Sequence, residues 1–380
     1  MADCSKFHTR IEIKPSSAKF SDDVTDNLQE QKIPFFKSGF RNHGDTWVIS
    51  VFVIVHIVAF FATMVVNDCW TNSHGDCAVK ALGRLSFQPL SENPLLGPSA
   101  STLDEMGALQ RTFLTEYHQT WRLFTFPVLH GGAIHLVINL CSVIFVGIHL
   151  EQEFGPLRIG IVYILSAFVG ALVAALFIQN TPAVGSSGAL YGLLGAMLSA
   201  LVLNWKFYNN KVAAIASLIF VSMINFVLGL LPYIDNFSSI GGFLSGILLG
   251  FVLLFTPQLR QVGGLFETCV KSSIMLRLKQ KLDRPVLRSV SLFLFSLLLA
   301  GCLAAVLHGV NINQYCKWCR YVDCVPFQRW QCKNIATSCE TMVSNAQLTL
   351  TCMSNGNYKV FPFTNISQAR INDLCTMICF

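Results

Sequence analysis

Residues 184–195 read VGSSGALYGLLG, which places a serine-containing loop of small residues directly before an apolar segment. The segment at 187–204 carries no charged residue and is close to the length that crosses a membrane. Lipid offers a hydroxyl no hydrogen-bond partner, so Ser187 has to face protein or trapped water. A Gly-x-Ser-Gly sequence alone is weak evidence for a nucleophile, because small residues also allow close helix packing. Its meaning therefore depends on which other side chains could meet Ser187.

The composition around this loop is that of a polytopic membrane protein. Of the 380 residues, 53% are hydrophobic and 13% are charged, and the mean hydropathy is +0.52. Soluble domains average about 25% charged residues. We therefore expect an all-α membrane bundle built from seven apolar segments of near-spanning length, at residues 46–66, 134–150, 157–178, 187–204, 211–230, 238–256 and 289–309.

Composition divides the chain into five parts: a polar tail at 1–45, a transmembrane core at 46–256, a basic loop at 257–288, a seventh span at 289–309 and a cysteine-rich tail at 310–380. The first 45 residues contain no apolar stretch of the signal-peptide type. We therefore expect a cytosolic N-terminal tail, with the first span acting as the signal anchor.

Loop charge predicts the orientation of the spans. Residues 257–288 contain seven basic and two acidic residues, and Lys206 and Lys211 lie in the connection between the fourth and fifth spans. Both basic loops are cytosolic if the N-terminus is cytosolic, and seven spans then place the C-terminal tail outside the cytosol. A stretch at 274–282 is also amphipathic and could lie along the membrane surface, but simple orientation charge is the preferred explanation.

Cysteine usage indicates the same topology. An even number of cysteines follows the last span, which is typical of disulfide pairing in an oxidising compartment. These eight are Cys316, Cys319, Cys324, Cys332, Cys339, Cys352, Cys375 and Cys379, and the first loop adds Cys69 and Cys77 on the same expected side. Asn365-Ile366-Ser367 is a glycosylation acceptor sequence. We therefore predict a multi-pass protein of the secretory pathway, in the Golgi, the endoplasmic reticulum or the plasma membrane.

A zinc site is the alternative for the Cys316-Lys317-Trp318-Cys319 sequence. Structural zinc sites usually show two close cysteine pairs, and no second Cys-x-x-Cys follows on this side. The sequence favours disulfides, and we predict neither a metal nor another cofactor.

Three polar side chains precede or enter the second span, where burial in a membrane is costly. His130, His135 and Asn139 are spaced five and four residues apart, so His135 and Asn139 share one helix face. They could be donors for a developing oxyanion, or they could form hydrogen bonds that only hold helices together. A metal site is less favoured, because no carboxylate in the bundle accompanies the histidines.

Glycines make smooth faces on two spans and predict that these helices touch. The sixth span has Gly242, Gly246 and Gly250, and the fourth has Gly188, Gly192 and Gly195. The residues just before the sixth-span glycines should then lie near Ser187, where a catalytic base would stand. They are Ser238, Ser239 and Ile240, and none is a histidine.

Over about residues 47–256 the chain resembles the rhomboid family of intramembrane serine proteases. The resemblance rests on six features that are specific only together: Trp121-Arg122, the His130, His135 and Asn139 spacing, Glu151 with Gly155, the Gly185-x-Ser187-Gly188 loop, Tyr191, and the glycine ladder that includes Gly242. The seventh span and the tail resemble the eukaryotic secretory-pathway branch, and the sequences QYCKWC and VPFQRW look plant-like.

The resemblance implies roles for individual residues. Ser187 aligns with the nucleophile, held by Gly185 and Gly188, and His130 and Asn139 align with the residues that stabilise the oxyanion. His135 aligns with a conserved second-span histidine, and Tyr191 with an aromatic residue that packs on the catalytic imidazole. The family's catalytic histidine corresponds to Ser239. The implied fold is a helical bundle with a water-accessible cavity on the lumenal side.

Ser239 is a serious departure, because a serine hydroxyl does not take up and return a proton near neutral pH. We therefore favour a proteolytically inactive rhomboid that binds single-pass transmembrane clients. The alternatives are an active serine protease with an unusual base, of which His308 is one candidate, and a channel, transporter or structural membrane protein. The net charge of +6 suits anionic lipid and gives no ground for nucleic-acid binding.

Overall fold

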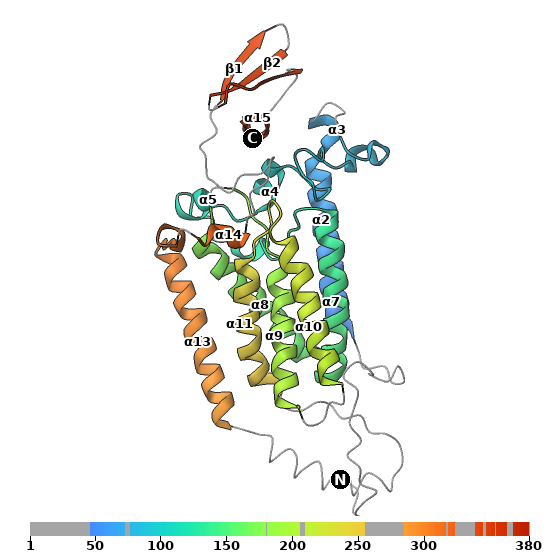
Figure 1. Ribbon diagram of the computed structural model, residues 1–380, viewed down its shortest axis with the longest axis vertical. Coiled ribbons are helices and arrows are strands. Elements are labelled where there is room, and N and C mark those ends of the chain that lie inside the picture. Colours follow the sequence, from blue (N-terminus) through green and yellow to red (C-terminus); the bar gives the residue numbers. More distant parts are fainter. Residues whose placement is uncertain are drawn as a thin grey trace, which may run out of the picture.

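The structure is a computed structural model that describes residues 46–72, 77–179, 181–205, 210–254, 285–316, 318–323, 339–344, 347–353, 355–362 and 368–379. Apolar helices run side by side in one bundle (Figure 1). Five are long and apolar enough to cross a membrane, and two are shorter: α2 (Trp47–Asn67), α7 (Ala133–Phe154), α8 (Pro156–Phe177), α10 (Lys211–Leu228) and α13 (Pro285–Leu307), with α9 (Ser187–Leu203) and α11 (Phe237–Leu253). Each predicted apolar segment is a helix, so the expected all-α membrane bundle is confirmed.

The helix α9 forms the centre of the bundle. Its side chains are buried without interruption from Ser187 to Met197, and it packs against α7, α8, α10 and α11. Its 17 residues span about 25 Å at the rise of an α-helix, which is less than the hydrocarbon thickness of about 30 Å. A helix this short can begin inside the bundle, so the serine at its first position can lie inside the bundle as well.

The helices α9 and α11 approach each other backbone to backbone. A Cβ atom placed on Gly242 would lie 2.0 Å from the carbonyl oxygen of Gly188. A Cβ on Gly246 would lie 2.1 Å from the carbonyl oxygen of Gly192. No side chain fits at these distances, so the predicted contact between the two glycine faces is confirmed.

A carboxylate from another helix satisfies the first N–H groups of α2. Glu151, near the end of α7, accepts hydrogen bonds from the backbone nitrogens of Val48 at 2.9 Å and Ile49 at 3.0 Å. These N–H groups have no partner within their own helix, and the helix dipole favours negative charge there. Glu151 thereby fixes α2 against α7.

The loop between the first two spans is ordered by short helices at one end of the bundle: α3 (Cys69–Asn72), η1 (Lys80–Leu85), α4 (Ala100–Met106), α5 (Arg111–Thr115) and α6 (Arg122–Thr125). Arg122 holds this loop together. Its Nη1 donates to the carbonyl oxygens of Asp104 and Ala108, each at 2.7 Å, and its Nε donates to Gln119 Oε1 at 2.8 Å. The Trp121-Arg122 sequence therefore has a structural role here.

The C-terminal tail contains a small domain that the sequence analysis did not foresee beyond its cysteines. An antiparallel sheet has the order β1 (Cys339–Ser344), β2 (Gln347–Cys352) and β3 (Tyr358–Pro362). The helix α15 (Gln368–Cys379) packs on the face that carries Leu348 and Leu350. Figure 1 shows this domain at the same end of the bundle as α3 and α4.

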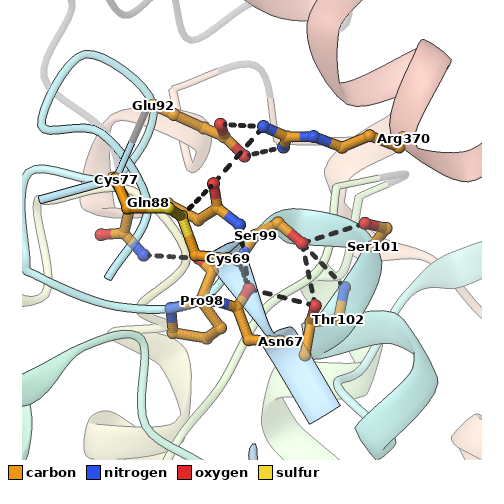
Figure 2. Close-up of polar contacts among 11 residues, drawn as sticks. Asn67, Cys69, Cys77, Gln88, Glu92, Pro98, Ser99, Ser101, Thr102 and Arg370 are labelled. Atoms are coloured by element: carbon orange, nitrogen blue, oxygen red, sulfur yellow. Dashed lines mark hydrogen bonds and ion pairs between the residues drawn. A yellow bond between two sulfur atoms is a disulfide. The ribbon is translucent and has the colours of Figure 1, made fainter. Parts of the chain in front are cut away.

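A buried ion pair joins the tail to the first loop (Figure 2). Arg370 of α15 donates to both carboxylate oxygens of Glu92, with the Nη2–Oε2 contact at 2.9 Å. Its Nη2 also lies 3.4 Å from Gln88 Oε1, and Gln88 Nε2 donates to Asn67 at the end of α2. The first loop and the tail therefore lie on one side of the bundle, as the cysteine pattern predicts.

Cysteines of the loop and the tail form disulfides, as predicted: Cys69–Cys77, Cys316–Cys319, Cys339–Cys375 and Cys352–Cys379. Several predicted features lie outside the described residues: the N-terminal tail at 1–45, most of the basic loop at 257–288 with the amphipathic stretch at 274–282, Cys324, Cys332 and the acceptor sequence at Asn365.

Candidate functional site

Two serine hydroxyls meet where α9 and α11 begin. Ser187 Oγ lies 2.9 Å from Ser239 Oγ and 3.4 Å from Ser238 Oγ. All three side chains are buried. The structure thus brings together the two positions that the sequence analysis assigned to a nucleophile and its base.

Backbone hydrogen bonds hold the two serine-bearing segments side by side. Val184 N donates to Tyr233 O at 2.8 Å, and Asp235 N donates to Val184 O at 3.1 Å. The Gly185 position is crowded as well, since a Cβ there would lie 2.0 Å from the ring of Phe126. The loop before α9 and the loop before α11 therefore form one unit.

His135 and Asn139 reach this unit from α7. His135 Nε2 lies 3.4 Å from Ser186 Oγ, and Asn139 Nδ2 donates to the same hydroxyl oxygen at 3.3 Å. His130 lies one layer behind, with its Nε2 3.4 Å from Asn139 Nδ2. The imidazole beside the serine loop is thus that of His135, whereas the sequence analysis assigned the oxyanion role to His130.

A further buried histidine was missed by the sequence analysis. His56, in the middle of α2, lies with its Nε2 2.7 Å from the Tyr163 hydroxyl. Its ring also meets the ring of His130 edge-on, with centroids 5.1 Å apart. The signal for it was a polar residue inside a segment that otherwise reads as lipid-facing. His56 extends the polar cluster of His130, His135 and Asn139 across the bundle.

Tyr191 lies one turn after Ser187 and ties α9 to α10. Its hydroxyl donates to the carbonyl oxygen of Ser222 at 2.5 Å, and its side chain is 7% exposed. The family resemblance implies packing of this ring on a catalytic imidazole. The sequence analysis assigned the position of that imidazole to Ser239.

The chemistry of the site follows from its side chains. The neighbour of Ser187 Oγ is the hydroxyl of Ser239. This hydroxyl can share a hydrogen bond with Ser187, but it does not remove the Ser187 proton as a base would. His308, considered above as a substitute base, is exposed at the end of α13. Asp235 is close by, but it accepts a hydrogen bond from Ser238 N at 2.6 Å and so caps the start of α11. Its burial raises the pKa of the Asp235 carboxyl to about 7.

Comparison with known proteins places this site in a family. The model of the rhomboid domain matches residues 117–255, which contain all the helices that build the serine pair and the His135–Asn139 pair. An Arabidopsis thaliana protein named inactive RHOMBOID-like protein 8 is 53% identical over 342 residues, covering 88% of this chain and 97% of the relative. The chain belongs to the rhomboid family.

Some rhomboid relatives of this chain have 'inactive' in their names and others do not. RHOMBOID-like protein 1 of Arabidopsis thaliana is 43% identical over 88% of this chain and 85% of the relative. Inactive rhomboid protein 1 of Danio rerio is 28% identical over 70% of this chain and 29% of the relative. This rhomboid is thus similar to two proteins that are named inactive, and it is identical to one of them at more than half of the aligned positions.

Proposed function

We propose that this rhomboid-family protein is proteolytically inactive and binds transmembrane segments of client proteins in a membrane of the secretory pathway. One observation supports the loss of activity most directly: Ser187 Oγ has Ser239 Oγ as its neighbour at 2.9 Å. Loss of the base in a serine protease costs about 10⁴- to 10⁶-fold in turnover. The proposal also agrees with the names of two relatives.

Client binding is supported by how much of the rest of the site the chain keeps. Ser187 begins a buried central helix, and His135 and Asn139 lie against the adjacent Ser186. We assign the positions of oxyanion donors to His135 and Asn139, with His130 supporting Asn139. Such a polar site within an apolar bundle would suit an extended, hydrated stretch of a client helix.

The proteolytic part of the proposal is tested by a matched cleavage assay in proteoliposomes. Wild type, Ser187→Ala and Ser239→His are given one single-pass substrate helix that contains small, helix-breaking residues. We expect no cleavage by wild type or Ser187→Ala, and measurable cleavage by Ser239→His. Cleavage by wild type that Ser187→Ala abolishes would show an active protease with an unusual base.

The binding part is tested by site-specific photo-crosslinking to the same helix. A photoreactive residue is placed at Ile240, which is 40% exposed and follows Ser239, and in a control protein at Val290, which is 49% exposed on α13. We expect covalent capture from position 240 and none from position 290. Equal capture from both positions would contradict specific client binding, because it would reflect chance encounters in the bilayer.

A further inference from the structure

The C-terminal tail docks on the segment that leads into the serine pair. Asp323, at the end of α14 (Arg320–Asp323), accepts a hydrogen bond from Asn236 N at 2.8 Å. Asn236 Nδ2 donates to the carbonyl oxygen of Val322 at 2.8 Å. Asn236 is the residue before α11 and stands three positions ahead of Ser239. Movement of α14 would therefore act directly on the start of α11.

The residues leading to α14 are held against the end of α8. Asn311 Nδ2 donates to the carbonyl oxygen of Ile178 at 3.2 Å, and Asn313 Nδ2 donates to that of Phe177. The Cys316–Cys319 disulfide then closes a turn just before α14. The described residues 311–316 and 318–323, called the strap below, thus run from the end of α8 to the start of α11.

Two carboxyl groups meet where the strap reaches α11. Asp323 Oδ1 accepts from Asn236 N, and Asp235 Oδ1 accepts from Ser238 N, so both carboxyls lie at the first turn of α11. Asp235 is 4% exposed and Asp323 is half-buried. A hydrogen bond between two carboxyl groups requires that at least one of them carries a proton. Two carboxylates this close, one buried and the other half-buried, would repel each other, so the pair titrates as a unit.

The described side chains around the pair supply hydrogen bonds and little charge. Backbone N–H groups of Asn236, Phe237 and Ser238 act on the two carboxyls. The adjoining stretches at 176–191 and 222–234 contain no Lys, Arg, His, Asp or Glu. The other titratable residues on these stretches and on α14 are Tyr191, Tyr233 and Tyr321. Arg320 begins α14, and its side chain lies outside the described part.

We propose that a proton shared by Asp235 and Asp323 latches the strap onto the start of α11, and that rising pH loosens this latch. Burial raises the pKa of both carboxyls, and the nearby Asp235 charge raises the pKa of Asp323 further. A carboxyl whose pKa is higher in the docked state than in the undocked state stabilises docking. The stabilisation is complete when the pH is below the ordinary pKa of a carboxyl, about 4. That contribution is lost as the pH rises through the raised pKa values of the docked pair.

The test is hydrogen–deuterium exchange of the full-length protein in nanodiscs at pH 5 and pH 8, with each rate divided by the intrinsic amide rate at that pH. In wild type we expect protection of the segment 236–240 to fall about tenfold or more at pH 8. Asp323→Asn and Asp235→Asn each leave one carboxylate beside an amide donor, which can keep the hydrogen bond without a titrating proton. Both variants should stay protected at both pH values.

Asp68→Asn is the matched control, because Asp68 pairs with Arg84 on the first loop, away from the strap. It should keep the wild-type response. A flat wild-type profile would overturn the proposal. So would Asn variants that respond to pH like wild type, or that lose protection at both pH values. None of these readouts depends on client binding, so this inference and the proposed function can fail separately.

Discussion

Ser239 lacks the property that a catalytic base needs most, the ability to hold a proton reversibly near neutral pH. The remaining features of the site do not require that property. Gly185 and Gly188 shape the loop, and Ser187 begins a buried helix whether or not it reacts. A change in one side chain can therefore remove the proton transfer and leave the fold of a rhomboid site in place.

Glu151 provides a prediction at the same scale. Its carboxylate is 1% exposed and accepts two backbone N–H groups, whereas the amide of Glu151→Gln offers one acceptor and a mismatched donor. We expect a loss of about 1–3 kcal/mol in the free energy of unfolding. Thermal unfolding in detergent measures it, with the exposed Glu105→Gln as control. Equal midpoints for the two variants would contradict this role.

At the scale of elements, the contact between α9 and α11 positions the serine pair. Glycines let the two backbones touch, and this close approach carries Ser239 to within 2.9 Å of Ser187. The glycine faces are legible in sequence because they repeat at helical spacing. Their consequence for the site depends on both helices starting at the same depth, which their shared length of 17 residues permits.

Gly246→Ala tests this contact. The added Cβ would meet the carbonyl oxygen and two further backbone atoms of Gly192, and backbone atoms cannot rotate aside. We expect the helices to separate, with a loss of about 3 kcal/mol in stability, measured as a lowered thermal midpoint. Gly301→Ala on α13 is the control, since nothing lies within 4 Å of its added Cβ. Similar losses in both variants would argue against backbone contact as the cause.

At the scale of the whole molecule, the tail is tied to the bundle at two separate places. The strap contacts the ends of α8 and α11, and α15 contacts the first loop through Arg370 and Glu92. Disulfides fold the tail into its own small domain. The described part of the tail thus lies at the end of the bundle where α9 and α11, the helices of the serine pair, begin.

A double-mutant cycle on Glu92 and Arg370 tests the second attachment. Both side chains are less than a tenth exposed, so removing one leaves the other charge buried without its partner. We expect Glu92→Gln or Arg370→Met alone to weaken tail docking by about 3 kcal/mol, and the double variant by less than the sum. Exchange protection of α15 reports docking. Strictly additive effects would show that the pair is not coupled.

Much of the architecture was predictable because hydrophobic length and periodicity are properties of contiguous sequence. The seven spans, the glycine faces and the cysteine-rich tail all follow from local patterns. The described helix ends fell within four residues of the expected ones, and the largest differences are the end of α7 at Phe154 and the start of α13 at Pro285. The last part of α7 carries Glu151, and this charged residue interrupts the apolar pattern from which the span was predicted. In the structure its carboxylate accepts hydrogen bonds from the start of α2.

The sequence by itself determined that this is a helical membrane protein with the serine loop, the His130, His135 and Asn139 cluster, and a serine at position 239. Only the tertiary structure decided which of these side chains meet. It set His135 beside the serine loop with His130 behind it, added His56 to the cluster, and joined Asp235 to Asp323. Such contacts link segments tens to hundreds of residues apart, and their partners are chosen by packing in three dimensions rather than by any local pattern.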